Sequence, residues 1–292
     1  MGLAGFLNIN KPKGITSHDV VYKIRKKLGR PIKVGHTGTL DPFAEGVLVL
    51  AVGQATKLTS LLQHQDKAYI ARVKLGIQTD TNDTTGDVVK ELVVDNIKES
   101  DILAVLEKFK GRIIQEPPIY SAIHVNGKRL YEYARNNQTV KIPKREVSIK
   151  RLDLLKYQEN DYLDILIECS SGTYIRSFGR DIGDALGICA TLKELKRIMV
   201  GSFDIENSLD LDIDLCEQDI ITVDHFFYSA VEIELDDTAA LNVRHGKLDF
   251  LAQYIGSDFA VGEIIKLKYE GNLLALVEKF DSKFRFVITF FL

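Results

Sequence analysis

The stretch Gly35-His36-Thr37-Gly38-Thr39-Leu40-Asp41-Pro42 places a carboxylate on a tightly restricted loop. Its two glycines allow close backbone approach and positive φ angles. Pro42 fixes its own φ and pushes Asp41 toward an extended conformation. An apolar run at residues 46–52 follows and predicts a buried strand. An aspartate before a proline is often only a turn residue, but this degree of constraint also suits an acid or nucleophile presented to a ligand.

The composition indicates an ordinary globular protein. The 292 residues are 45% hydrophobic and 27% charged, enough for one large core or two smaller ones. The three cysteines, Cys169, Cys189 and Cys216, show no paired spacing, which argues against a disulfide scaffold or a zinc site and fits a reducing cytoplasm. We also expect no signal peptide and no membrane span, because no apolar run approaches about 20 residues.

The formal net charge of −3 is unusual for a nucleic-acid binder, but the charges are segregated. Acidic residues concentrate at residues 204–224 and 232–237. Basic residues form two segments, Lys23, Arg25, Lys26, Lys27, Arg30 and Lys33, and then Lys128, Arg129, Arg135, Lys141, Lys144 and Arg145. Each basic segment fits either a phosphate-binding surface or a solvated face.

The periodicity predicts helices and strands without regular βαβ alternation. We expect a helix from about Ser17 to Leu28 capped by Thr16 or Ser17, and further helices at 55–64, 100–110, 130–135 and 173–186. Strands are expected at 67–75, 147–155 and 162–169. These elements indicate an α+β fold with a mixed, largely antiparallel sheet.

The C-terminal part is expected to form a second, smaller unit. Residues 204–224 are interpreted as a peripheral acidic connector. Beyond them, strand-like runs occur at 231–235, 263–268, 273–278 and 284–292, separated by Gly246, Gly256, Gly262 and Gly271. We predict a catalytic domain at 1–228 and a small β domain at 229–292, which is marginal as an independent fold.

Four more blocks of sequence accompany the Asp41 loop in a fixed order. They are Asn8-Ile9-Asn10-Lys11-Pro12-Lys13-Gly14-Ile15-Thr16-Ser17; Lys67-Ala68-Tyr69 with Leu75-Gly76-Ile77-Gln78-Thr79-Asp80-Thr81, Asp83 and Gly86; Gln115-Glu116-Pro117-Pro118-Ile119-Tyr120-Ser121-Ala122 with Gly127-Lys128-Arg129-Leu130-Tyr131; and Cys169-Ser170-Ser171-Gly172-Thr173-Tyr174-Ile175-Arg176. Together the five blocks resemble the TruB type of pseudouridine synthase, and a single block would be weak evidence. The resemblance implies the pseudouridine synthase fold, with a PUA-like C-terminal domain.

The resemblance also implies roles for individual residues. Asp41 is expected to be the nucleophile, a role that suits a carboxylate because it can attack an electron-poor centre and later depart. Arg176 is expected to pair with it through its guanidinium fork. The remaining expected contacts are Tyr69 stacked on the target uracil, Tyr174 on the base, His36 on the RNA, Leu195 as an apolar wall, and Lys11, Lys67 and Arg197 on phosphates. Without the resemblance, the tyrosines and Leu195 would be interpreted as core residues.

The expected reaction is the isomerisation of uridine to pseudouridine at position 55 in the T arm of tRNA, on a base swung out of its stack. It is redox-neutral, and no metal cluster or nucleotide motif is present in the sequence, so no cofactor is expected. We expect a cytoplasmic monomer that binds tRNA, with no membrane and no obligatory protein partner. Two alternatives remain open: a guide-RNA-dependent pseudouridine synthase within a multiprotein particle, and an RNA-binding or folding-assistant protein with a vestigial site.

Overall fold

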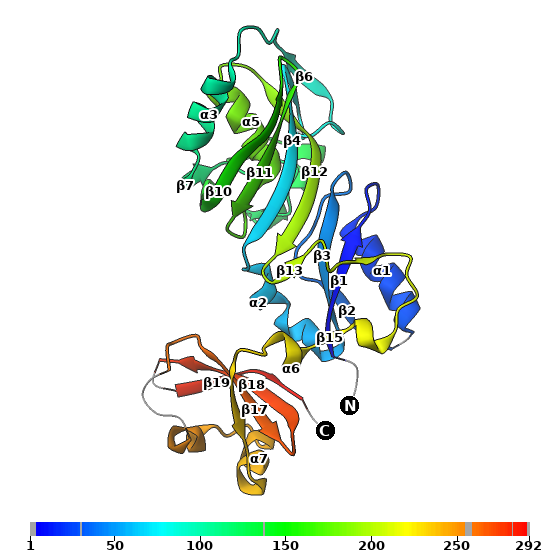
Figure 1. The fold of residues 1–292 in the computed structure, drawn as a ribbon, viewed down its shortest axis with the longest axis vertical. Helices are drawn as coiled ribbons and strands as arrows, with labels where there is room; N and C mark the ends of the chain where they lie inside the picture. Colours follow the sequence, from blue (N-terminus) through cyan, green and yellow to red (C-terminus); the bar gives the residue numbers. More distant parts are fainter. Residues whose placement is uncertain (1–3, 30, 137, 255–258, 282, 291–292) are drawn as a thin grey trace.

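The computed structural model describes residues 4–29, 31–136, 138–254, 259–281 and 283–290 (Figure 1). Arg30 of the first basic segment, Gly256, and the end of the last predicted strand at Phe291 and Leu292 lie outside the described residues. Within these ranges, no helix is both long and apolar enough to cross a lipid bilayer.

A single mixed sheet organises most of the chain. Eleven strands of the described residues join it, eight of them in the order β14-β1-β3-β12-β4-β11-β10-β7. The strands are β1 (Gly5–Lys11), β2 (Val34–His36), β3 (Glu45–Val52), β4 (Lys67–Leu75), β7 (Gly111–Gln115), β10 (Arg145–Gln158), β11 (Tyr162–Cys169), β12 (Ala190–Val200), β13 (Phe203–Asp204), β14 (Leu209–Asp210) and β15 (Ile221–Thr222). Pairing is antiparallel except between β1 and β14 and between β3 and β12, so the predicted mixed, largely antiparallel sheet is confirmed.

The helices form where the sequence places caps and apolar stripes. They are α1 (Ser17–Leu28), α2 (Thr59–Gln63), α3 (Glu99–Lys108), α4 (Leu130–Arg135), α5 (Ile175–Ala185), α6 (Val223–Phe226) and α7 (Asp237–Arg244), with 3-10 turns η1 (Gly53–Leu58), η2 (Glu217–Asp219) and η3 (Asp249–Gln253). Thr16 and Asp19 make a reciprocal capping box at the start of α1, and Val20 and Ile24 bury its apolar face. In Figure 1, α3 and α5 lie together on one face of the β4, β10, β11 group.

Two short hairpins extend from the sheet. One pairs β5 (Ile77–Thr79) with β6 (Val88–Glu91), and the other pairs β8 (His124–Val125) with β9 (Lys128–Arg129). Asn126 and Gly127 both have positive φ angles between β8 and β9, as the Asn-Gly turn signal predicts.

The sheet consists of two halves that meet where β3 lies beside β12. Only Lys196–Glu45 and Arg197–Gly46 are register pairs of these strands in the described chain. Gly46 has φ +106°, and a Cβ there would lie 2.2 Å from the carbonyl oxygen of Arg197. Glycine is therefore required at this close approach. We call this junction the seam.

The acidic connector is more integrated than the sequence indicated. β13 pairs with β12, while β14 and β15 both pair with β1. Leu211 and Ile220, between these short strands, are buried. Residues 204–224 therefore line the edge of the sheet, because local strand pairings hold a segment whose acidic composition suggested a solvated linker.

The C-terminal residues form a second sheet, in which the described strands follow the order β16-β17-β18-β19. Their bounds are Val231–Glu234, Ile264–Tyr269, Asn272–Phe280 and Lys283–Thr289. One face of this sheet packs on α7, and Val277 and Val243 belong to the same hydrophobic cluster. From the other face, Leu276 and Ile288 join a hydrophobic cluster with Phe6 of β1. The predicted small β domain is present and consistent with a PUA-like domain, but its core continues into the larger sheet.

Charged groups reinforce the same contact. The ammonium of Lys266, on β17, is buried and lies 2.9 Å from a carboxylate oxygen of Asp224, which belongs to α6. Lys268 lies 3.0 Å from carboxylate oxygens of both Asp224 and Glu232. Apolar and ionic contacts both cross the boundary between residues 1–228 and 229–292. The division into these two domains therefore remains a proposal.

Candidate active site

A cavity of about 510 Å³ opens beside the seam. Of the residues predicted from the sequence, those that line it are Asp41, Lys67, Tyr69, Tyr174, Arg176, Leu195 and Arg197. They come from the β2–β3 loop, from β4, from the start of α5 and from β12. Side chains far apart in the sequence thus meet around one opening.

The loop that carries Asp41 is fixed at both sides. The hydroxyl of Ser17 accepts a hydrogen bond from Leu40 N at 2.8 Å and donates to Leu40 O at 2.9 Å. The N–H of Gly14 donates to Pro42 O at 2.8 Å. The Asp41 side chain remains about one-third exposed. The predicted presentation of an acid on a restricted loop is therefore realised in the structure.

Arg176 lies at the centre of a charged network. Its Nε is 2.9 Å from Oδ2 of Asp41, and its Nη1 is 3.5 Å from Oδ2 of Asp83. It also donates to the carbonyl oxygens of Thr81 at 3.2 Å and Tyr120 at 3.0 Å. The Arg176 side chain is only 10% exposed. A buried guanidinium held on four sides has little freedom, so it fixes the orientation of the Asp41 carboxylate.

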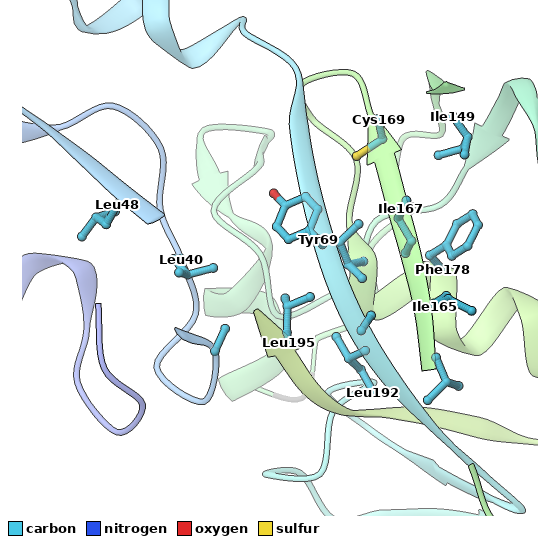
Figure 2. Close-up of a cluster of buried hydrophobic side chains, with 14 of the residues drawn as sticks. Leu40, Leu48, Tyr69, Ile149, Ile165, Ile167, Cys169, Phe178, Leu192 and Leu195 are labelled. Atoms are coloured by element: carbon cyan, nitrogen blue, oxygen red, sulfur yellow. The ribbon is translucent and has the colours of Figure 1, made fainter. Parts of the chain in front are cut away.

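Aromatic and apolar side chains form part of the cavity wall. Figure 2 shows Tyr69 on β4 and Leu195 on β12, with Leu40 in the loop before β3. Burial raises the pKa of Tyr69 to about 12, so its phenol stays neutral at physiological pH. Tyr174 stands directly before α5 and lines the same cavity. These rings and Leu195 make a slot in which a planar, uncharged base can be buried.

Lys11, Lys67 and Arg197, which were predicted to contact phosphates, bind backbone carbonyls in the structure. Lys11 is fully buried, and its ammonium donates to the carbonyl oxygens of Pro12 and Ile15 at 2.9 Å and of Pro42 at 3.4 Å. Burial lowers the pKa of Lys11 to about 8. Lys11 does not line the cavity in this structure, and its contacts show that it holds the ends of two loops together.

Lys67 and Arg197 contribute to the cavity wall, but their N–H donors bind backbone carbonyls of the protein. The ammonium of Lys67 donates to Gln65 O at 2.7 Å and Gln63 O at 3.0 Å. The guanidinium of Arg197, 2% exposed, donates to the carbonyls of Val47, Thr39 and Gly38 at 2.7, 3.2 and 3.0 Å. Arg197 therefore joins β12 to the Asp41 loop across the seam.

His36 lies on β2, outside the cavity lining. It is half-buried, and its Nδ1 is buried without a hydrogen-bond partner among the described residues. Burial, and then the nearby Arg197, lower the pKa of His36, so its imidazole is neutral at physiological pH. Its predicted contact with RNA stays a prediction.

Sequence reasoning assigned no role to two buried residues that complete the site. Asp83, 5% exposed, is the second anion beside Arg176. Gln115 makes two hydrogen bonds to the backbone of Tyr174. Both residues lie within the quoted sequence blocks. For Asp83, an acid followed by a glycine-containing turn is the sequence feature that could have indicated a role in the site. In the described part of the chain, no three His, Cys, Asp or Glu side chains are placed to hold a metal ion.

Comparisons with known proteins identify the family to which the chain is similar. Residues 25–175 match the family model described as TruB family pseudouridylate synthase (N terminal domain). A protein of Clostridium tetani named tRNA pseudouridine synthase B is 38% identical over 287 residues, which covers 97% of this chain and 98% of that protein. A protein of the same name from Staphylococcus saprophyticus is 47% identical over 214 residues, 71% of this chain and 70% of that protein.

Solved structures with the same fold include a Cbf5-Nop10-Gar1 complex, matched with a TM-score of 0.67 at 26% identity over 94% of this chain and 78% of the other. A second is an H/ACA RNP bound to a substrate RNA containing 2'-deoxyuridine, with a TM-score of 0.67, 25% identity and coverage of 95% and 79%. These matches confirm the predicted pseudouridine synthase fold. With its family model spanning more than half of the sequence and a relative aligned over nearly its full length, the chain belongs to the TruB family of pseudouridylate synthases.

Proposed function

We propose that this chain isomerises uridine to pseudouridine at position 55 in the T arm of tRNA, with Asp41 as the nucleophile acting on a flipped-out base. The observation that carries the proposal is the Asp41 carboxylate, partly exposed at 2.9 Å from Arg176 Nε in a cavity walled by Tyr69. The relatives named tRNA pseudouridine synthase B support tRNA as the substrate.

The chemistry required matches the groups present. The N1–C1′ glycosidic bond breaks, the uracil turns within the slot, and a C5–C1′ bond forms in its place. The C5 hydrogen leaves as a proton and N1 ends protonated, so no redox partner is needed. Asp41 acts as nucleophile and leaving group during this exchange. Arg176 supplies the compensating charge and holds the carboxylate in place.

The aromatic residues provide the binding energy for the extruded base. Flipping a stacked base costs a few kcal/mol, and stacking on a ring returns about 1–3 kcal/mol. We assign this stacking to Tyr69 and a further base contact to Tyr174, with Leu195 as the apolar wall. The exposed basic residues of α1, β9 and α4 provide positive charge for the phosphate backbone.

We further propose that the protein works in the cytoplasm as a monomer, without an obligatory protein partner or guide RNA. The two solved structures, a Cbf5-Nop10-Gar1 complex and an H/ACA RNP, are multicomponent assemblies and represent the guide-dependent alternative. They are 25–26% identical to this chain, compared with 38% and 47% for the relatives named tRNA pseudouridine synthase B.

A direct test uses purified protein and a T-arm transcript with no other component. We expect pseudouridine at the position equivalent to 55 and nowhere else in the transcript. Asp41→Asn should abolish product and still bind the RNA, because the amide preserves the size of the side chain but not its nucleophilicity. Turnover by Asp41→Asn would refute the assignment of Asp41, and activity that depends on an added guide RNA and protein partners would refute stand-alone action.

A further inference from the structure

The strands β7 and β10 end in a cross-strand pair directed at the active site. Gln115, the last residue of β7, is in register with Arg145, the first residue of β10. Directly opposed residues of an antiparallel pair project from the same face of the sheet. Both side chains contact the segment that enters α5.

Gln115 holds the backbone of Tyr174. Its Nε2 donates to Tyr174 O at 3.1 Å, and its Oε1 accepts from Tyr174 N at 2.8 Å. The residue is fully buried, so neither hydrogen bond competes with water. Tyr174 is the N-cap residue of α5, and its side chain makes no capping hydrogen bond in the described structure. The amide of Gln115 therefore fixes the point at which α5 begins.

Arg145 holds the other parts of the same segment. Its guanidinium carbon lies 5.4 Å from the centroid of the Tyr174 ring, within the range of a cation–π contact. Its Nη1 donates to Gly172 O at 3.4 Å. Gly172 has φ +81°, and a Cβ there would lie 3.1 Å from that same Nη1. The guanidinium thus bears on both the ring of Tyr174 and the turn that precedes it.

We propose that Gln115 and Arg145 form a positioning pair that sets the Tyr174 ring and the first turn of α5. The pair acts through Tyr174 and Arg176, since neither Gln115 nor Arg145 lines the cavity. Arg176 follows Tyr174 by two residues and orients Asp41, so a displaced start of α5 moves two groups of the site together. This inference rests on the proposed function of that site.

The sharpest variant is Gln115→Glu, because its hydrogen-bonding capacity depends on pH. A protonated carboxyl accepts from Tyr174 N and donates to Tyr174 O as the amide does. An ionised carboxylate cannot donate, so it places a second acceptor next to the carbonyl oxygen of Tyr174. Burial raises the pKa of a carboxyl group, which brings this change of protonation toward neutral pH. We expect the single-turnover rate at saturating T-arm RNA to be about tenfold below wild type at pH 8, and to recover most of that loss at pH 6.

Two companion variants and two matched controls separate positioning from stability. Gln115→Met should lose about tenfold at every pH, and Arg145→Met somewhat less, with unchanged RNA affinity. Gln158→Glu, at the exposed far end of β10, and Arg112→Met, on an exposed part of β7, make the same chemical changes away from Tyr174 and should match wild type. Circular dichroism at each pH confirms that the compared proteins are folded.

The outcomes distinguish this inference from the proposed function. If wild type forms pseudouridine and Asp41→Asn does not, but folded Gln115→Glu and Arg145→Met equal wild type at pH 6 and pH 8, the positioning pair is refuted. If wild type forms no pseudouridine, the proposed function itself fails. Should both Gln115 variants fail to fold, Arg145→Met against Arg112→Met decides, and equal rates would overturn the proposal.

Discussion

Replacing Asp83 by Asn tests whether the second anion beside Arg176 contributes to the reaction. The Asp83 Oδ1 accepts hydrogen bonds from Thr81 Oγ1 and Thr85 N, both at 3.0 Å, and an asparagine retains that oxygen. The change therefore falls on Oδ2, which lies 3.5 Å from Arg176 Nη1. In the asparagine variant, an amide N–H donor faces the N–H donor of Arg176 Nη1, and the negative charge is lost.

The expected magnitude follows from the geometry. Two unit charges about 4 Å apart attract by about 4 kcal/mol at an effective dielectric constant of about 20. Desolvation of the buried pair offsets part of this, and net values for hydrogen bonds to charged groups are about 1.5–3 kcal/mol. Arg176 keeps Asp41 and two backbone carbonyls. We therefore assign about 2 kcal/mol to the loss, which corresponds to a rate about 30-fold lower.

The assay is release of tritium from RNA labelled at C5 of uridine, measured in single turnover at saturating enzyme. Asp164→Asn is the matched control, because Asp164 pairs with Arg72 at 2.7 Å outside the cavity lining. We expect Asp164→Asn to keep the wild-type rate and Asp83→Asn to lose rate without losing RNA affinity. A wild-type rate for Asp83→Asn, or a defect confined to RNA binding, would show that Asp83 does not orient Arg176 for the chemical step.

Other substitutions probe the supports of the site. Gly46→Ala places a Cβ 2.2 Å from Arg197 O at φ +106°, so we expect a loss of at least about 3 kcal/mol and a melting midpoint lower by roughly 6–12 °C; Gly187→Ala, also at positive φ but with open space, should lose far less. Lys11→Met removes the buried ammonium that donates to three backbone carbonyls, of which Pro42 O keeps the N–H of Gly14 as a donor, and should cost about 2 kcal/mol or more of unfolding free energy. The slope of log Kd for RNA against log salt should not change in that variant, whereas loss of a phosphate contact would reduce the slope by nearly one. Because the folded pKa of His36 is below its ordinary 6.5, the unfolded chain binds more protons near pH 6, and stability should fall as pH drops below about 6.5. His36→Asn should flatten that part of a chemical-denaturation pH series, and an unchanged curve would contradict the assignment of a neutral, half-buried imidazole.

Local signals allowed much of the fold to be predicted. The cap at the start of α1 could be predicted because capping involves only neighbouring residues, and the structure shows that Thr16 is the cap and that Asp19 completes a capping box. The alternation of β4 is visible in the sequence because one face is buried and the other is not. β12, at the centre of the sheet, was not recognised. Its pairing with β4 has register shifts between Leu192 and Glu194 and between Arg197 and Met199, so its apolar residues do not keep a period of two.

The residues of the site likewise include some that the sequence could predict and some that it could not. Asp41 could be found because glycine and proline around it constrain its own loop. The resemblance to known motifs named Arg176 and Tyr69, and the structure places both in the same cavity as Asp41. The burial of Arg197 was not predictable, because its acceptors are backbone carbonyls about 150 residues away in the sequence. For Lys11, the contact with Pro42 O likewise depends on a segment distant in the sequence. From composition alone, lysine and arginine are expected at the surface. Whether a given cation is buried depends on the tertiary contacts that supply its hydrogen-bond acceptors.

The seam between β3 and β12 has a consequence for how this enzyme could be divided or deformed. The acid belongs to the β2–β3 loop, while its guanidinium partner Arg176 and the ring of Tyr69, to which we assign stacking, belong to α5 and β4 on the opposite side. Because each side carries only part of the proposed site, we expect a version of the protein split along the seam to regain turnover only when its parts reassemble. Any shear along this line changes the separation of acid and arginine directly, so the two register pairs of β3 with β12 and the close approach at Gly46 limit how far the site can deform.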